Sequence, residues 1–208
     1  MTTMPSSANL LRQATLDQLA NDLAARGLSI LPAALEDAAC ASLLTEAHRL
    51  DAAGRLRAAG VGRERATFSD IRGDRILWLE PGLTPVTDEF LRMTDLLRTH
   101  LNRHLYLGLS EYEGHLACYR PGTGYQKHLD RIHGSNVRVV TLIAYLNPAW
   151  RNEDGGQLRL HLGETVLDVT PQAGTVVAFL SGEFWHEVVP SYRDRWAISG
   201  WFRCAASG

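Results

Sequence analysis

The segment YQKHLDRIH, residues 125–133, brings a histidine, an aspartate and a second histidine within six positions. If this segment is extended, His128 and Asp130 project from the same face, because side chains alternate along a strand. The two positions are then roughly 6–7 Å apart, so both side chains can reach one metal ion. His133 has the wrong spacing to join them on a regular strand. A catalytic metal commonly needs a third protein ligand, which must therefore come from elsewhere.

His186, in the segment GEFWHEVVP, is the expected third ligand. It opens a short apolar strand, and strands distant in sequence become neighbours in a rolled sheet. Two histidines and one carboxylate form the facial triad that suits Fe(II) and leaves adjacent positions open for reactants. The same ligands with Glu187 as general base would suit a zinc hydrolase, but on a strand Glu187 points away from His186. Ordinary surface or core histidines are the alternative to either metal.

Arg195 starts the strand-like run RWAISGWF, in which alternation separates a small or polar face from a bulky apolar one. The first face contains Arg195, Ala197, Ser199 and Trp201, and the second contains Trp196, Ile198 and Phe202. An arginine on an inward face requires an anion, since a buried and unpaired guanidinium is very costly. A dicarboxylate read end-on by the planar guanidinium would provide it. A protein carboxylate such as Asp194 would do the same.

Three segments with helical periodicity lie before the metal-ligand and arginine segments in the sequence. Residues 15–27, with Thr15 as N-cap and Gly27 as stop signal, residues 33–50 and residues 86–105 carry apolar residues at helical spacing. A short strand, LSILP, follows the first helix, and from about residue 110 strand-like runs alternate with turns. These runs are HLACYR, VRVVTLIAYLN, QLRLHL, GTVVAFL, HEVVP and RWAISGWF. The pattern predicts an α+β, mainly β protein, with a closed or double-sheet core and the N-terminal helices packed on one sheet.

The length of 208 residues indicates a single domain, residues 1–208. Residues 1–68 would provide helical support and the start of a mobile loop, for which the Gly- and Arg-rich stretch 52–74 is the candidate. The 21 basic and 23 acidic residues nearly cancel, which argues against a nucleic-acid partner. Three widely spaced cysteines suit neither a disulfide framework nor a zinc knot. Without a leader or an apolar stretch of about 20 residues, we expect a cytoplasmic monomer with no membrane partner.

Taken together, His128-x-Asp130, His186 and Arg195 resemble the Fe(II)- and 2-oxoglutarate-dependent oxygenases, whose core is a double-stranded β-helix, or jelly roll. The sequence is most similar to the hypoxia-inducible-factor type prolyl 4-hydroxylases, over residues 69–203. The segments that carry the similarity, in matching order, are DIRGDRILWLEPG, CYRPGTGYQKHLD, VRVVTLIAYLN, DGGQLRL and WHEVVPSYRDRWAISGWF. One residue fewer in the YRPGTGY turn, and no added zinc or targeting domain, point to a compact bacterial-type homologue.

The resemblance implies an iron site and a neighbouring 2-oxoglutarate site. The metal ligands would be His128, Asp130 and His186. Arg195 would pair with the distal carboxylate of 2-oxoglutarate, and Tyr145 would hydrogen-bond the same carboxylate. Tyr119 would help to position the cosubstrate, and Tyr125 would border the pocket.

The resemblance also implies residues that contact the protein substrate. Arg138 and Trp201 match positions that contact the target proline. A regular strand would put Arg138 and Tyr145 on opposite faces, so Arg138 requires a β-bulge or a reach around the strand end. The segment that folds over bound substrate in relatives contains Arg72 and Asp74 in this chain.

The implied activity is trans-4-hydroxylation of a prolyl residue in a protein substrate with an exposed prolyl loop, forming succinate and carbon dioxide. Fe(II), 2-oxoglutarate and O2 would be required, with ascorbate as a supporting reductant. For a bacterial relative, the translation factor EF-Tu is the expected substrate. Two alternatives remain open: a small-molecule or free amino-acid oxygenase, and a non-catalytic metal- or 2-oxoglutarate-binding module. A long mobile lid favours a polypeptide over a small substrate.

Overall fold

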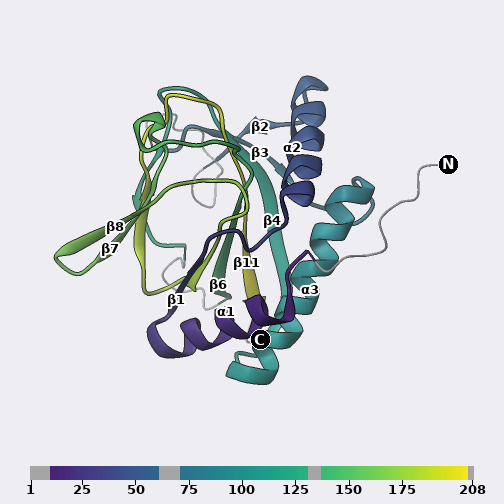
Figure 1. The fold of residues 1–208 in the computed structure, drawn as a ribbon, viewed down its shortest axis with the longest axis vertical. Helices are drawn as coiled ribbons and strands as arrows, with labels where there is room; N and C mark the ends of the chain where they lie inside the picture. Colours follow the sequence, from purple (N-terminus) through teal and green to yellow (C-terminus); the bar gives the residue numbers. More distant parts are fainter. Residues whose placement is uncertain (1–9, 61–70, 131–136, 206–208) are drawn as a thin grey trace.

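The computed structural model describes residues 10–60, 71–130 and 137–205, and Figure 1 shows two sheets with helices on one side. The large sheet comprises, in spatial order, β1 (Leu28–Leu31), β9 (Val176–Leu180), β6 (Arg138–Tyr145), β11 (Arg195–Cys204), β4 (Leu109–Tyr119), β3 (Asp74–Trp78) and β2 (Arg57–Ala58). The small sheet comprises β5 (Tyr125–His128), β10 (Trp185–Val188), β7 (Leu158–Leu162) and β8 (Thr165–Val169). The named strands in each sheet pair antiparallel. The expected mainly β, double-sheet architecture is confirmed.

Alternation along β11 assigns its side chains to two separate cores, as its sequence predicts. Trp196, Ile198 and Phe202 join the cluster that the large sheet shares with the helices. Ala197, on the other face, joins the cluster between the two sheets, together with Leu160 of β7. The inner face of the large sheet is therefore free to present Arg195, Ser199 and Trp201 to the space between the sheets, where all three line a cavity.

The helices are α1 (Gln13–Arg26), α2 (Asp37–Ala52) and α3 (Pro85–Leu105). Their apolar residues pack against the outer face of the large sheet in one cluster. α3 begins with a capping box. The Thr84 side chain accepts a hydrogen bond from the Thr87 backbone amide, and the Thr87 side chain accepts one from the Thr84 backbone amide. This helical layer leaves the opposite face of the large sheet to the site.

The first helix begins earlier than the sequence suggests. Thr15 is not its N-cap: that position is Arg12, and the carbonyl oxygen of Arg12 already accepts from the amides of Thr15 and Leu16. Thr15 therefore lies within the first turn. The predicted stop at Gly27 is confirmed, with φ of 69°, a backbone conformation that glycine adopts without strain.

Some strands differ from the prediction. The strand predicted from HLACYR is present as β4, but it begins at Leu109 rather than near residue 115, because its polar first half is held by pairing with β11. β8 is mostly exposed and owes its conformation to pairing with β7. The predicted mobile stretch 52–74 contains β2 and the start of β3, while residues 61–70 lie outside the described part of the chain.

The three cysteines are free. Within the described ranges, no helix has the length and apolar character needed to cross a bilayer.

Candidate metal and cosubstrate site

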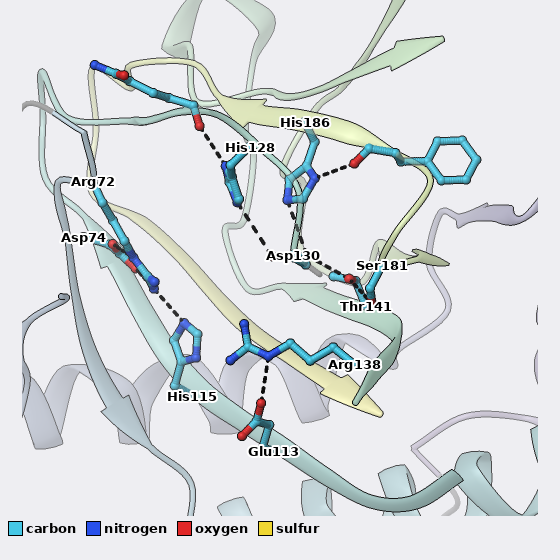
Figure 2. Close-up of polar contacts among 12 residues, drawn as sticks. Arg72, Asp74, Glu113, His115, His128, Asp130, Arg138, Thr141, Ser181 and His186 are labelled. Carbon is cyan, nitrogen blue, oxygen red and sulfur yellow. Dashed lines mark hydrogen bonds and ion pairs between the residues drawn. The ribbon is translucent and has the colours of Figure 1, made fainter. Parts of the chain in front are cut away.

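His128 and His186 lie opposite each other on neighbouring strands of the small sheet. They form a register pair of β5 and β10, and Asp130 follows two residues after β5 ends. Nε2 of His128 is 3.7 Å from Oδ1 of Asp130, and Nε2 of His186 is 3.5 Å from Oδ2 of the same carboxylate (Figure 2). One ligand atom from each of the three side chains lies within 4.8 Å of the others. The structure thus brings two nitrogen donors and one oxygen donor to a single point.

The backbone sets the orientation of both imidazoles. Nδ1 of His128 is 2.7 Å from the Gln126 carbonyl oxygen, and Nδ1 of His186 is 3.0 Å from the Phe184 carbonyl oxygen. A carbonyl oxygen can only accept, so each Nδ1 carries the proton and each Nε2 presents a lone pair to the centre. Burial, followed by the neighbouring His186, lowers the pKa of His128 to about 4, so this imidazole is neutral at neutral pH.

Asp130 is buried and ionised. Burial alone would raise its pKa, but the adjacent His186 and His128 rings and a hydrogen bond from Thr141 hold the pKa below its usual value. The Thr141 hydroxyl donates to Oδ2 at 2.8 Å and in turn accepts from Ser181 at 2.9 Å. The site therefore offers two imidazoles whose Nε2 atoms face the centre and one oriented carboxylate, a donor set that suits a divalent metal.

Arg195 lies nearly buried, with 2% of its surface exposed, on the inner face of the large sheet. Its Nε donates to the Gly156 carbonyl oxygen at 2.7 Å, and its guanidinium carbon lies 5.1 Å from the ring centres of both Tyr119 and Tyr145. Asp194, the alternative partner, pairs with Arg120 instead. Across the described ranges, no carboxylate forms an ion pair with Arg195. The guanidinium is thus left with an unmet requirement for an anion.

The Tyr145 hydroxyl has a similar unmet requirement. It is buried and has no hydrogen-bond partner among the described residues, which is uncommon for a buried polar atom. Burial raises the pKa of Tyr145 to about 12, so the hydroxyl keeps its proton and can donate it. A carboxylate placed beside Arg195 would satisfy both groups.

A cavity of about 930 Å³ joins these two parts of the site. Its lining includes the following residues expected from the sequence: Arg72, Tyr119, Tyr125, His128, Asp130, Arg138, His186, Arg195 and Trp201. Two further expected residues are not part of the lining but contact residues that are: Tyr145 contacts Arg195, and Asp74 forms an ion pair with Arg72. The residues fit Fe(II), because the donor set is the facial triad. They also fit a dicarboxylate, because the buried guanidinium and the partnerless hydroxyl provide a receptor for its far end.

A β-bulge brings Arg138 into this cavity. Arg138 pairs with Arg203 of β11 whereas Val140 pairs with Phe202, so two residues of β6 occupy the space of one. Val139 turns to the helical side of the sheet, and Arg138 turns inward. The requirement for a bulge, expected from the sequence, is therefore met.

Trp201, Trp78 and His115 form an aromatic wall on the same side of the cavity, and Arg138 stacks on it. The Arg138 guanidinium carbon lies 3.5 Å from the centre of the Trp201 ring, and Arg138 Nε donates to Glu113 at 2.9 Å. The Trp201 ring is 6.5 Å from that of Trp78 and 5.6 Å from that of His115. Because Glu113 fixes the guanidinium, the cation and the indole ring form one preorganised surface.

Arg72 and Asp74 form a second ion pair at the cavity. Arg72 donates to both carboxylate oxygens of Asp74, at 2.7 and 2.9 Å, and its Nη2 lies 3.3 Å from Nε2 of His115. Tyr125 lies between this pair and the metal ligands: its ring centre is 5.0 Å from the Arg72 guanidinium and 3.7 Å from the stacked His128 ring. A bulge in β5 allows Tyr125 and His128 to share a face.

The structure also contains site residues that the sequence did not identify. Thr141 shares the inner face of β6 with Tyr145, and alternation alone could have revealed it. Trp78 and His115 could not be found in this way, because their contact depends on the register of β3 against β4. Glu187, the proposed base of a zinc hydrolase, pairs with His161 at 3.2 Å on the opposite face from His186, which disfavours that chemistry. His133 lies outside the described residues.

Comparisons with known proteins identify the family of this chain. The family model of the 2OG-Fe(II) oxygenase superfamily matches residues 114–203. Egl nine homolog 1 from Homo sapiens is 36% identical over 152 residues, covering 68% of this chain and 35% of the relative. Prolyl hydroxylase EGLN3 from Homo sapiens is 33% identical over 172 residues, covering 77% of this chain and 71% of the relative. The chain spans less than half the length of the Egl nine homolog 1 relatives that it matches.

Solved structures give the same result. A Pseudomonas putida prolyl-4-hydroxylase superposes with a TM-score of 0.85 and 41% identity, covering 91% of this chain and 99% of that one. A prolyl hydroxylase from Trichoplax adhaerens, in complex with a peptide of the hypoxia-inducible factor oxygen degradation domain, superposes with a TM-score of 0.84 and 27% identity, covering 91% and 89%. The two antiparallel sheets are accordingly a jelly roll, and the cofactors of the superfamily are Fe(II) and 2-oxoglutarate, with O2 as cosubstrate. The chain belongs to the hypoxia-inducible-factor type prolyl hydroxylases of the 2OG-Fe(II) oxygenase superfamily.

Proposed function

We propose that this chain hydroxylates C4 of a prolyl residue in a protein substrate and forms succinate and carbon dioxide from 2-oxoglutarate. One observation carries the proposal: the His128, Asp130 and His186 triad and the buried Arg195 guanidinium, which has no carboxylate partner among the described residues, line the same cavity. The triad alone would also suit a hydrolase, and the arginine alone would suit many anions. Together they match a bidentate cosubstrate that binds metal at one end and arginine at the other.

In this proposal the three ligands hold Fe(II), and Thr141 keeps the Asp130 carboxylate in position. Iron with 2-oxoglutarate supplies the oxidising power toward an unactivated C–H bond that protein side chains lack. Arg195 and Tyr145 bind the far carboxylate of 2-oxoglutarate, and Tyr119, stacked near the same guanidinium, shapes that end of the pocket. These side chains orient the reactants and exclude water.

The wall formed by Arg138 and Trp201 is the proposed surface for the prolyl residue. The Trp201 indole offers an apolar face for the pyrrolidine ring, and the fixed cation beside it suits the carbonyl oxygens of a peptide. Arg72, held by Asp74, and Tyr125 form the side of the cavity next to His128. Asp74 itself is buried beneath Arg72, so its proposed role is to hold that arginine.

A polypeptide substrate is favoured over a free amino acid. The cavity of about 930 Å³ lies at the upper end of the usual range for small-ligand sites, roughly 300–1,000 Å³. Trp78, part of the aromatic wall, is 38% exposed, so the wall continues from the cavity to the surface. The Trichoplax adhaerens neighbour binds a peptide, which supports the same assignment. A prolyl loop of the translation factor EF-Tu is the first target that we propose to test, with the enzyme acting as a cytoplasmic monomer.

The proposal is tested by incubating the protein with Fe(II), 2-oxoglutarate, air and candidate substrates, and by fragmenting the products in a mass spectrometer. The expected result is one added oxygen atom on a proline, with succinate formed in equal amount. The small-molecule alternative is tested in parallel with free proline and other amino acids. Efficient succinate formation coupled to a metabolite, with every candidate polypeptide unmodified, would exclude a peptidyl substrate.

A further inference from the structure

A second group of metal-binding side chains lies in the helical layer, apart from the cavity between the sheets. Asp17 is on α1, and His100 and His104 are one turn apart on α3. One ligand atom from each of the three lies within 4.8 Å of the others. Figure 1 shows α1 and α3 next to each other on the helical side of the molecule, and none of the three residues lines the cavity that contains the iron ligands.

The His104 ring is oriented in the way that metal-binding imidazoles are. Its Nδ1 lies 2.9 Å from the His100 carbonyl oxygen, which can only accept, so Nδ1 carries the proton. Nε2 of His104 therefore presents a lone pair. The two imidazole rings stack with their centres 4.0 Å apart and an interplanar angle of 28°. The backbone of α3 thus holds one imidazole in a fixed tautomer directly against the other.

His100 provides the second observation that points to a ligand. Its residue surface is 9% exposed, and its Nε2 is buried without a hydrogen-bond partner among the described residues. Oδ1 of Asp17 lies 3.3 Å from that nitrogen, within reach of a shared ion but without hydrogen-bond geometry. Burial, followed by the neighbouring His104, lowers the pKa of His100, which disfavours a charged histidine paired with Asp17. A buried ring nitrogen that lacks a hydrogen-bond partner beside a carboxylate is unfavourable, and a cation bound between them would satisfy both groups.

We propose that Asp17, His100 and His104 form a second divalent metal site, distinct from the iron site. Two imidazoles and one carboxylate suit an ion of borderline softness, with Zn²⁺ the best match, and the exposure of Asp17 and His104 leaves its remaining position to water. A bound ion would link α1 to α3, two of the helices that cover the large sheet.

The test counts Zn²⁺ ions on the metal-stripped full-length chain by titration calorimetry and elemental analysis. The native chain is expected to bind one ion more than the variants Asp17→Asn and His104→Gln, both of which change exposed side chains. The iron-site variant His128→Ala should retain the second ion, and Zn²⁺ should raise its melting temperature. Adding His104→Gln to this variant should abolish that rise. The matched control is His48→Gln, which changes an exposed histidine on α2 and should bind as many Zn²⁺ ions as the native chain does.

Two results would overturn the proposal. If Asp17→Asn and His104→Gln bind as many Zn²⁺ ions as the native chain, the three side chains do not hold an ion. If His128→Ala binds none, the chain has a single metal site and the helical cluster is an ordinary polar contact. Circular dichroism of each variant checks that α1 and α3 remain folded, and activity of the Fe(II)-loaded His104→Gln protein should match the native chain.

Discussion

Removing the groups that would hold the far carboxylate of 2-oxoglutarate should weaken cosubstrate binding in a graded way. Tyr145→Phe deletes one hydroxyl that would donate to a carboxylate, a bond worth about 1.5–3 kcal/mol, or roughly 10- to 150-fold in Kd. Arg195→Met removes the buried charge partner, worth about 2–5 kcal/mol, or roughly 30- to 4,000-fold. Arg195→Lys should fall between them, since it keeps the charge and loses the planar fork.

The structure also predicts how Tyr145→Phe affects the stability of the fold. Its hydroxyl is buried and has no partner in the part of the chain described, so Tyr145→Phe should leave the free energy of unfolding unchanged or raise it. Arg195→Met also removes the bond from Nε to the Gly156 carbonyl, and some loss of stability is expected. Tyr145→Phe is therefore the cleaner probe of ligand binding.

The assay is an anaerobic titration of the Fe(II)-loaded protein with 2-oxoglutarate, followed by the weak visible charge-transfer band of the chelate. Fe(II) affinity, measured separately by competition with a chelator, should stay constant across the series. If Arg195→Met and Tyr145→Phe bind 2-oxoglutarate as tightly as the native protein, the assignment of this end of the cavity is refuted.

Three further outcomes are expected. Thr141→Val should lower Fe(II) affinity by about 10- to 100-fold in chelator competition, because the aspartate ligand loses its orienting hydrogen bond. Arg138→Ala should raise KM for a prolyl peptide and leave 2-oxoglutarate affinity unchanged, whereas Arg203→Ala, which also removes a partner of Glu113, should leave both unchanged. Burial lowers the pKa of His128 to about 4 and that of His115 to about 3. Between pH 6.5 and about 4 the unfolded chain therefore binds more protons than the folded chain, and the free energy of unfolding of the metal-free protein should fall by up to about 2.7 kcal/mol per pH unit in urea titrations.

Each of these outcomes has a specific contradiction. Native Fe(II) affinity in Thr141→Val would show that the hydroxyl does not orient the carboxylate. If Arg138→Ala and Arg203→Ala raise KM equally, the increase comes from the loss of a positive charge beside Glu113 and not from the loss of the guanidinium stacked on Trp201. A metal-free protein whose stability is constant from pH 6.5 to about 4 would show that the two histidines titrate normally in the fold.

The sequence predicted the parts of the site that follow from strand alternation and residue chemistry. His128 and His186 were expected to converge although they are far apart in sequence, and their strands are paired. Arg195 was expected on an inward face with Ser199, and both residues line the cavity. Strand alternation was sufficient to place Arg195 because β11 lies in the middle of the large sheet and its two faces differ clearly in polarity.

Other features depend on information that a single sequence does not carry. Asp130 lies beyond the end of β5, so its position is set by a bend and by Thr141 rather than by a regular strand. His115 reaches Trp78 only through the register of two strands, and nothing local specifies that register. Thr15 is not the N-cap because α1 begins at Gln13; the N-cap is Arg12, whose side chain makes no capping hydrogen bond, so capping preference alone does not locate the start of this helix.

The convergence of His128, Asp130 and His186 on one ion is tested most directly by anomalous diffraction at the iron edge, on crystals grown without oxygen in Fe(II) and 2-oxoglutarate. We expect the strongest anomalous peak to lie between Nε2 of the two histidines and the Asp130 carboxylate, with density for 2-oxoglutarate that extends from the peak toward Arg195. The strongest peak at any other position, or a bound 2-oxoglutarate that does not reach Arg195, would contradict this account.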